Sequence, residues 1–245
     1  MTYCVGMMLD AGLVFMSDTR TNAGLDNIST FKKMTTWEIK GERVITLLSS
    51  GNLATTQAVV SLIEERGHAH DQRDPLILAE PSMFQAARMV ADTLRDVIAK
   101  HEETGQQADS AFGATLILGG QIKGSPPRLF MIYPEGNFIE ASADTPFFQI
   151  GETKYGRPIL VRAYEPKMSF EEAMKLLFVS FDSTLKANLS VGAPFDFHLY
   201  RKDALQIEMT GRIETENAYF QKVSEGWGDA LKNALDSLPD YSLDL

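Results

Sequence analysis

Hydrophobic and polar positions in the first fifty residues form short runs that predict β-strands. These runs cover residues 3–8, 13–17, 34–39 and 43–49. Asp10-Ala11-Gly12 separates the first two runs, and Lys40-Gly41-Glu42 separates the last two. Connections of this length favour hairpins, so we expect two β-hairpins at the start of the chain.

Apolar residues then recur at helical spacing and predict two helices. The first begins near Asn52, a favourable N-cap residue, and ends at Gly67, a favourable stop. The second begins at Ser82, which forms a capping-box pattern with Gln85, and continues to about His101. Its apolar face contains Met83, Ala87, Val90, Leu94, Val97 and Ile98.

The second half of the chain repeats this order of strands followed by helices. We expect four strands, over residues 111–118, 128–133, 138–141 and 147–150. Their turn signals include Gly119-Gly120 and Pro134-Glu135-Gly136. A short helix after Gly151 and a longer one over 169–187, capped by Ser169 and Glu172, come next. Two strands over 195–200 and 206–213 and a helix over 218–238 complete the pattern.

Segregated blocks of strands and helices, without strict alternation, favour an α+β layered fold. We predict a four-layer αββα sandwich, in which two antiparallel sheets pack face to face and helices cover their outer sides. No internal repeat, low-complexity tract or linker marks a boundary. We therefore expect one domain over residues 1–245, with a C-terminal helical segment from about residue 218.

Charge, cysteine content and the lack of long apolar runs indicate which partners and compartments are unfavourable for this chain. The chain has 23 Lys and Arg against 33 Asp and Glu, and the net charge of −10 makes nucleic acid an unfavourable partner. Cys4 is the single cysteine, so no internal disulfide can form, and its apolar strand predicts an inert core residue. No signal peptide or membrane-spanning run is apparent, so we expect a cytoplasmic protein that does not enter a membrane.

Thr2 is the most informative residue for chemistry. A small residue after the initiator allows removal of Met1, which would leave threonine at the N-terminus. A free α-amino group has a pKa of about 7.7–8, so one residue would then carry both a nucleophilic hydroxyl and a general base. Many proteins begin with Met-Thr and have no such activity, so the dipeptide alone does not establish this role.

Neighbouring segments strengthen the case. Thr2-Tyr3-Cys4-Val5-Gly6, then Ser17-Asp18-Thr19-Arg20, Phe31-Lys32-Lys33-Met34 and Leu47-Leu48-Ser49-Ser50-Gly51 follow one another in the order typical of one family. The chain resembles the β subunits of the proteasome superfamily, and the details of these segments are similar to a bacterial branch of it. The resemblance is dense over residues 2–57 and implies the fold of N-terminal-nucleophile (Ntn) hydrolases.

The resemblance also implies roles for individual residues. Asp18 would pair with Lys33, whose ammonium lowers the cost of a threonine alkoxide, and Arg20 would support this pair. Gly51 would supply the oxyanion N–H group. Lys32 is the competing lysine, because adjacent residues of a strand face opposite ways and only one can face the site. An ordinary surface pair is the alternative reading of Asp18 and Arg20.

The family's pattern is incomplete in the second half of the chain. Ser190 matches a supporting serine of the family, whereas Ala187 replaces its supporting aspartate in the simplest alignment. Glu152, within Gly151-Glu152-Thr153, replaces a second supporting serine. The nucleophile, the lysine and the oxyanion glycine are retained, but the orientation of the amine is not explained.

We therefore expect a threonine hydrolase that cleaves peptide or other amide bonds and needs no cofactor or metal. Two alternatives stay open: an amidohydrolase or acyl transferase for non-protein or isopeptide amides, and a catalytically silent scaffold subunit. The resemblance implies a large homo-oligomer, either a ring or an open spiral, and does not identify an unfoldase or operon partner. His68, His70 and Asp71 do not complete a metal site.

Overall fold

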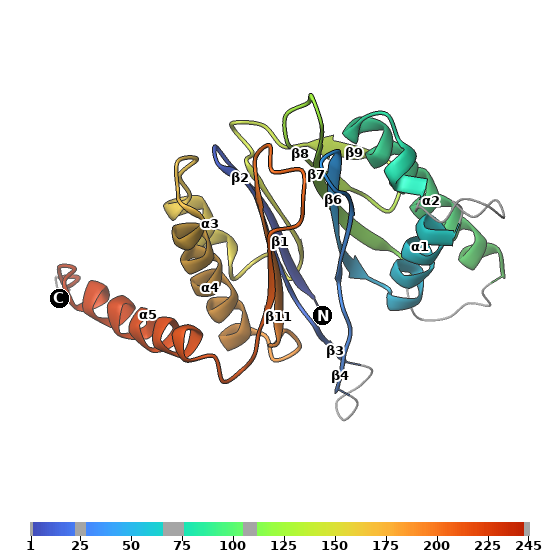
Figure 1. The fold of residues 1–245 in the computed structure, drawn as a ribbon. Coiled ribbons are helices and arrows are strands. Elements are labelled where there is room, and N and C mark those ends of the chain that lie inside the picture. The colour runs from blue at the N-terminus through green and yellow to red at the C-terminus, as the bar shows by residue number, and fades with distance from the viewer. Residues whose placement is uncertain (1, 23–27, 66–75, 105–111, 243–245) are drawn as a thin grey trace.

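The computed structural model describes residues 2–22, 28–65, 76–104 and 112–242. Two β-sheets face each other in the middle of the molecule, and pairs of helices cover their outer sides (Figure 1). The predicted αββα arrangement is thus confirmed. No helix in the described ranges is long and apolar enough to cross a membrane.

The first sheet contains the N-terminal hairpin at its centre. Its strand order is β10-β1-β2-β11-β12, and every neighbouring pair is antiparallel. The strands are β1 (Tyr3–Leu9), β2 (Gly12–Asp18), β10 (Phe147–Gly151), β11 (Phe195–Arg201) and β12 (Met209–Ile213). Because β1 lies between β2 and β10, the start of the chain is flanked by the ends of two strands far apart in sequence.

The second sheet is an antiparallel meander in sequence order, β5-β6-β7-β8-β9. Its strands are β5 (Met34–Ile39), β6 (Arg43–Gly51), β7 (Ala114–Ile122), β8 (Arg128–Ile132) and β9 (Phe138–Glu140). A separate short pair, β3 (Arg20–Asn22) and β4 (Ile28–Thr30), lies at the end of the sandwich where the chain begins (Figure 1).

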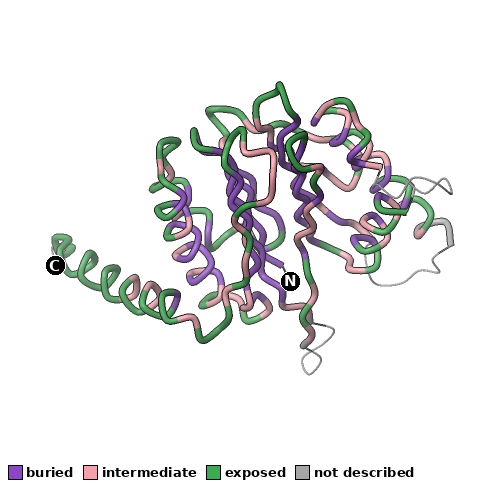
Figure 2. Tube along the Cα trace, viewed as in Figure 1, coloured by how far each residue is buried: buried purple, intermediate pink, exposed green. Residues whose placement is uncertain are grey.

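The helices divide between the two sheets. The α1 helix (Leu53–Glu65), a short 3₁₀ helix (Leu76–Ala79) and α2 (Met83–Thr104) pack on the second sheet. The α3 helix (Arg157–Ala163) and α4 (Phe170–Ala187) cover the first sheet. The α5 helix (Ala218–Asp236) contacts α4 through its first turns and then extends away from the body. Most of it is exposed (Figure 2).

Three apolar clusters hold these layers together. Two lie between a sheet and its helices, and the third lies between the sheets and includes Cys4, Phe15, Leu48, Ile117 and Tyr200. In Figure 2 the buried residues are concentrated in the facing strands. Side chains alternate along β1, so this strand contributes to two of the clusters. Tyr3 and Val5 face α4 and belong to the cluster under the helices, whereas Cys4 faces the opposite sheet and belongs to the cluster between the sheets.

The structure corrects one turn prediction. Gly119 and Gly120 lie inside β7 rather than in a turn. A Cβ on Gly119 would lie 2.7 Å from Cζ of Phe15, and one on Gly120 would overlap the Val44 carbonyl oxygen. Phe15 belongs to the facing sheet, whereas Val44 belongs to β6, the strand next to β7, so close packing between the sheets accounts for Gly119 and close packing within the second sheet for Gly120.

Other differences are short elements and boundaries. The sequence patterns predict neither β3 nor β4 nor the 3₁₀ helix, and the strand before α5 begins at Met209 instead of the predicted residue 206. The capping box of Ser169 and Glu172 at the start of α4 is confirmed. Gly67 and Ala111, the predicted ends of two elements, lie outside the described residues.

Candidate active site

A buried ion pair lies at the end of the first sheet. Asp18 ends β2, and Lys33 precedes β5 with its Nζ atom 2.8 Å from Oδ1 of Asp18. The side chains are 0% and 5% exposed, respectively. Lys33 Nζ also donates to the carbonyl oxygen of Arg20 at 2.6 Å, and the Lys33 carbonyl accepts the Ser49 N–H at 2.9 Å. The ammonium group is therefore held by Asp18 and Arg20, and the backbone of Lys33 is held by Ser49.

The Asp18 carboxylate is held by backbone donors as well as by the lysine. Tyr3 N–H donates to Oδ1 at 2.9 Å, and Gly192 N–H approaches Oδ2 at 3.5 Å. Burial raises the pKa of Asp18, while the Lys33 ammonium and these two N–H groups oppose that rise. The aspartate thus connects the start of β1, the residue before β5 and the loop before β11.

Thr2 lies one residue before this connection and is buried. Its carbonyl oxygen accepts the Glu152 N–H at 2.7 Å, which joins the start of β1 to the end of β10. Gly151, with φ of 84°, makes this approach possible, because a Cβ there would overlap the Thr2 carbonyl oxygen. Thr2 is consequently placed between the ends of β2 and β10, beside the Asp18–Lys33 pair.

Tyr3 anchors the same strand from its other face. Its hydroxyl lies 2.7 Å from Ser180 Oγ of α4 and accepts from Gln149 Nε2 at 2.6 Å. Burial raises the pKa of Tyr3 to about 12. A Cβ on Gly156 would overlap the Tyr3 hydroxyl, so glycine allows the ring to reach this position. The network fixes the strand that follows Thr2, and no sequence pattern predicts it.

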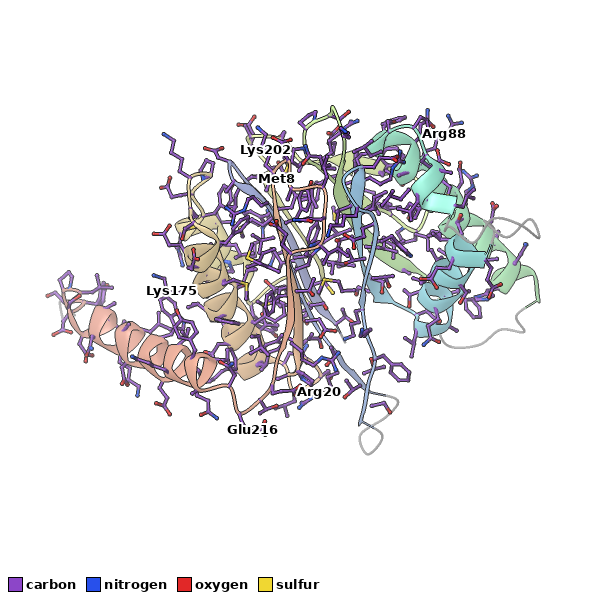
Figure 3. All side chains as sticks on the ribbon, in the orientation of Figure 1. Met8, Arg20, Arg88, Lys175, Lys202 and Glu216 are labelled. Carbon is purple, nitrogen blue, oxygen red and sulfur yellow. The ribbon has the colours of Figure 1, made fainter. Side chains whose placement is uncertain are left out.

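Arg20 organises the loop between α4 and β11. Its Nη1 donates to the carbonyl oxygen of Leu189 at 3.0 Å, and its guanidinium lies against Gly192. Figure 3 shows Arg20 at the end of the sandwich where the chain begins. Arg20 therefore supports the pair in two ways: its carbonyl binds Lys33 and its side chain positions the loop that approaches Asp18.

Gly51 occupies the end of β6 and pairs with Ala114 of β7. Its φ of 116° is a conformation that residues with a Cβ rarely adopt, and a Cβ would lie 2.5 Å from the Gly113 carbonyl oxygen. The position therefore requires glycine. Ser50 is also near the start of β1, because a Cβ on Gly151 would lie 3.0 Å from Ser50 Oγ.

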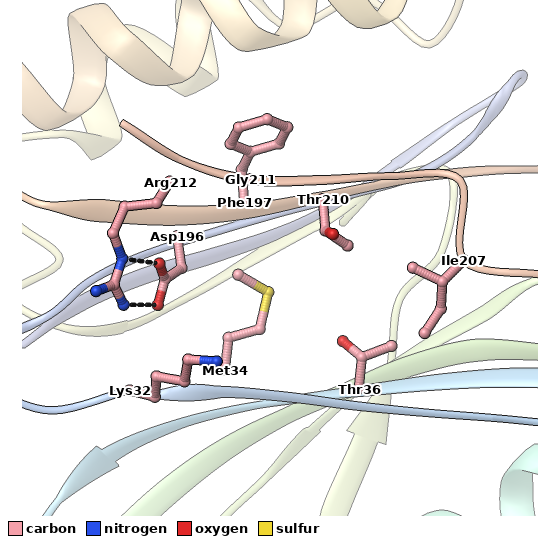
Figure 4. Close-up of a pocket in the computed structure, with 9 residues that line it drawn as sticks. All are labelled: Lys32, Met34, Thr36, Asp196, Phe197, Ile207, Thr210, Gly211 and Arg212. Carbon is pink, nitrogen blue, oxygen red and sulfur yellow. Dashed lines mark hydrogen bonds and ion pairs between the residues drawn. The ribbon is translucent and has the colours of Figure 1, made fainter. Parts of the chain in front are cut away.

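The two adjacent lysines face different environments. Lys33 is buried against Asp18, whereas Lys32 is exposed and lines a cavity of about 500 Å³ between β5 and the β11–β12 pair. Figure 4 shows this cavity, with the bidentate pair of Asp196 and Arg212 on the side formed by β11 and β12. Lys33 is therefore the lysine of the ion pair.

The remaining predicted residues lie around the end of α4. Ser190 is half-buried, and its N–H donates to Asn188 Oδ1 at 2.9 Å. Ala187 is exposed as the last residue of α4. Asn188, the next residue, donates from Nδ2 to Glu152 Oε2 at 3.0 Å. The polar contact at this point therefore comes from Asn188, which directly follows Ala187 but was not among the predicted site residues.

Cys4 and the His68-Ala69-His70-Asp71 segment are the other candidates from the sequence. Cys4 is fully buried and burial raises the pKa of its thiol, which disfavours the reactive thiolate. His68, His70 and Asp71 lie outside the described residues. Among the residues that are described, no group of three His, Cys, Asp or Glu side chains is arranged to hold a metal ion.

Comparison with known proteins identifies the family of the chain. The family model described as "Proteasome subunit" matches residues 2–195. The chain belongs to the proteasome subunit family. It is a proteasome-related protein with the Ntn-type fold that the family implies. No curated protein matches the chain at a significant level.

Three solved Anbu structures are similar to this chain over nearly their whole length. A Gly-1 mutant of Anbu from Hyphomicrobium sp. strain MC1 has 48% identity and a TM-score of 0.90, with 99% of this chain and 100% of that one covered. Anbu from Yersinia bercovieri has 45% identity and a TM-score of 0.89, with 99% and 100% covered. The helical assembly of the Anbu complex from Pseudomonas aeruginosa has 42% identity and a TM-score of 0.90, with 98% of each chain covered.

Proposed function

We propose that the chain is an Ntn hydrolase that cleaves peptide or other amide bonds with Thr2 after Met1 is removed. The observation that carries the proposal is the buried Asp18–Lys33 pair next to Thr2, anchored through the N–H of Tyr3. An ammonium in this desolvated position favours a negatively charged threonine oxygen. Membership of the proteasome subunit family supports the same assignment.

The proposed reaction has two balanced halves. Thr2 Oγ1 attacks the amide carbonyl carbon, its proton moves to the Thr2 α-amine, and the Gly51 N–H stabilises the oxyanion. The C–N bond then breaks, the leaving amine takes the proton, and an ester with Thr2 is left. Water attacks this ester, releases the acid and restores the hydroxyl. Neither a metal nor an organic cofactor enters these steps.

Covalent labelling tests the assignment. Intact mass first establishes whether Met1 is absent, and a threonine-selective electrophile followed by peptide mapping then locates the modified residue. We expect modification at Thr2, loss of modification in Thr2→Ala, and near-normal modification in Lys32→Ala, because Lys32 is exposed and is not the lysine that pairs with Asp18. Retention of Met1 in the folded protein, or an unmodified Thr2, would favour the alternative of a scaffold subunit.

We also propose that the chain self-associates into a large homo-oligomer. The α5 helix extends from the body and exposes Leu231 and Leu235, which share one face by their spacing. Leu238, two residues after the helix, is exposed as well. One of the similar solved structures is described as a helical assembly. Light scattering should give a mass well above that of one 27.2 kDa chain, and Leu235→Asp should lower it. Electron microscopy would then distinguish a ring from an open spiral.

A further inference from the structure

Glu152 is a buried carboxylate at the edge of the candidate active site. It follows β10, is 9% exposed, and donates its N–H to the carbonyl oxygen of Thr2. This hydrogen bond makes Glu152 a direct neighbour of Thr2 across the ends of β1 and β10. The chemistry proposed above does not use its side chain.

The Glu152 side chain is fixed from a second element. Asn188, which caps the end of α4, donates from Nδ2 to Oε2 of Glu152, and its own Oδ1 accepts the N–H of Ser190. Asn188 is therefore oriented by the backbone before it binds the carboxylate. Ala187, at the position where the family's pattern has an aspartate, contributes no polar side chain here.

A buried carboxylate is costly unless donors or a positive charge compensate it. Asp18 already has Lys33 as its cation. Within the described residues, the Glu152 carboxylate receives one side-chain hydrogen bond, from the neutral amide of Asn188. Removal of Met1 would create a new cation one residue before Tyr3, because the α-amino group of Thr2 would then be protonated in part of the population.

We propose that Glu152, held by Asn188, is the positioning residue for the α-amine of Thr2 and accepts a hydrogen bond from it once Met1 is gone. This inference rests on the proposed function. It assigns to Glu152 and Asn188 the orienting role that Ala187 cannot perform. A negative charge beside the ammonium also makes the amine a stronger base, which favours transfer of the hydroxyl proton to it.

The inference predicts a measurable change in the titration of the amine. Glu152→Gln keeps the size of the side chain and an oxygen that can accept from Asn188, but it removes the negative charge. The rate of acylation of the Thr2 α-amine by acetic anhydride, followed by mass spectrometry as a function of pH, reports the pKa of that amine. We expect the midpoint to fall by about one pH unit in Glu152→Gln, because an opposite charge nearby raises the pKa of an ammonium.

Matched variants separate this effect from a change in net charge or structure. Glu165→Gln removes the same charge at an exposed position beside Pro166, whose carbonyl contacts Asp10 at the opposite end of β1. It should leave the midpoint unchanged. Glu152→Asp retains the charge and should keep the midpoint closer to the wild-type value than Glu152→Gln does.

The amine measurement does not depend on catalysis. Thr2 can be exposed by cleavage of a removable N-terminal tag, so the test applies whether or not Met1 is removed in the cell. Equal midpoints in the wild type and Glu152→Gln would overturn the inference even if Thr2 is labelled by electrophiles. A shifted midpoint together with an unreactive Thr2 hydroxyl would support the inference and contradict the proposed function.

Discussion

Gly192 lies against the guanidinium group of Arg20, so closely that a Cβ on Gly192 would overlap its central carbon. The same loop supplies the Gly192 N–H that approaches Asp18 and the Leu189 carbonyl that accepts from Arg20. Because Gly192 has no side chain, the long side chain of Arg20 can pack directly against its backbone. This packing joins the loop before β11 to the buried ion pair of Asp18 and Lys33.

Gly192→Ala should therefore displace the Arg20 side chain and so alter the loop that approaches Asp18. The added methyl group displaces the flexible end of Arg20, and we expect a loss of about 0.5–1.5 kcal/mol in the free energy of unfolding, the contribution of one hydrogen bond such as that to Leu189. The rate of electrophile labelling at Thr2 should fall as well. Urea denaturation and labelling kinetics measure the two effects.

Gly226→Ala is the matched control for this substitution. Gly226 lies within α5, and no atom is within 4 Å of the position its Cβ would take. Alanine is favoured over glycine in a helix by about 1 kcal/mol, so this variant should not lose stability. Equal behaviour of the two variants would show that the Arg20 contact has no structural importance.

Much of the layered fold could be predicted from the sequence. The helices α2 and α4 have long apolar faces and serine caps, and these local signals do not depend on distant contacts. Gly119 and Gly120 show where such reasoning fails. Their turn-like composition is explained by Phe15 and Val44, which approach them from other strands and are distant in sequence.

The sequence predicts one pair of contacting residues in the candidate site, Asp18 and Lys33, but not the other, Asn188 and Glu152. Asp18 and Lys33 lie in segments whose residues match a family pattern, and the structure has their side chains in contact. The contact between Asn188 and Glu152 joins residues 36 positions apart without any such pattern. Only the packing of the end of α4 against the end of β10 brings these two side chains together.

Lys33→Met should destabilise the fold as well as abolish labelling. It leaves the fully buried Asp18 carboxylate without its ammonium partner, which costs about 3–5 kcal/mol. The double variant Asp18→Asn with Lys33→Met removes both charges and should recover part of this loss in urea denaturation, yet remain unlabelled at Thr2. Normal labelling of the double variant would show that the pair is structural.

Gly151→Ala should be among the most damaging single substitutions at the site. Its φ of 84° strains any residue with a Cβ, and that Cβ would also overlap the Thr2 carbonyl oxygen. Gly41→Ala is a control with a similar φ of 79° and no atom within 4 Å of its Cβ, so it should cost only the strain, about 1–2 kcal/mol. A larger loss for Gly151→Ala in urea denaturation measures the contact with Thr2. Equal losses would contradict the close approach of β10 to the start of β1.

His198 provides a prediction about pH. It is fully buried between the sheets, its Nδ1 lies 2.8 Å from Thr46 Oγ1, and its ring stacks on Phe15. Within the described part of the chain, Nε2 has no hydrogen-bond partner. Burial lowers the pKa of His198 from 6.5 to about 4, because the charged ring would be poorly solvated there.

The direction of the pH effect on stability depends on whether the folded or the unfolded chain binds the proton at the higher pH. Between pH 6.5 and about 4 the unfolded chain protonates this histidine while the folded chain does not, so acid favours unfolding. A difference of this size corresponds to about 3 kcal/mol, present in full above pH 6.5 and lost as the pH falls towards 4. His198→Phe preserves an aromatic ring beside Phe15 and removes the titration. Its free energy of unfolding, measured in urea across this range, should fall less steeply with acid than that of the wild type, and parallel profiles would exclude His198 as the cause.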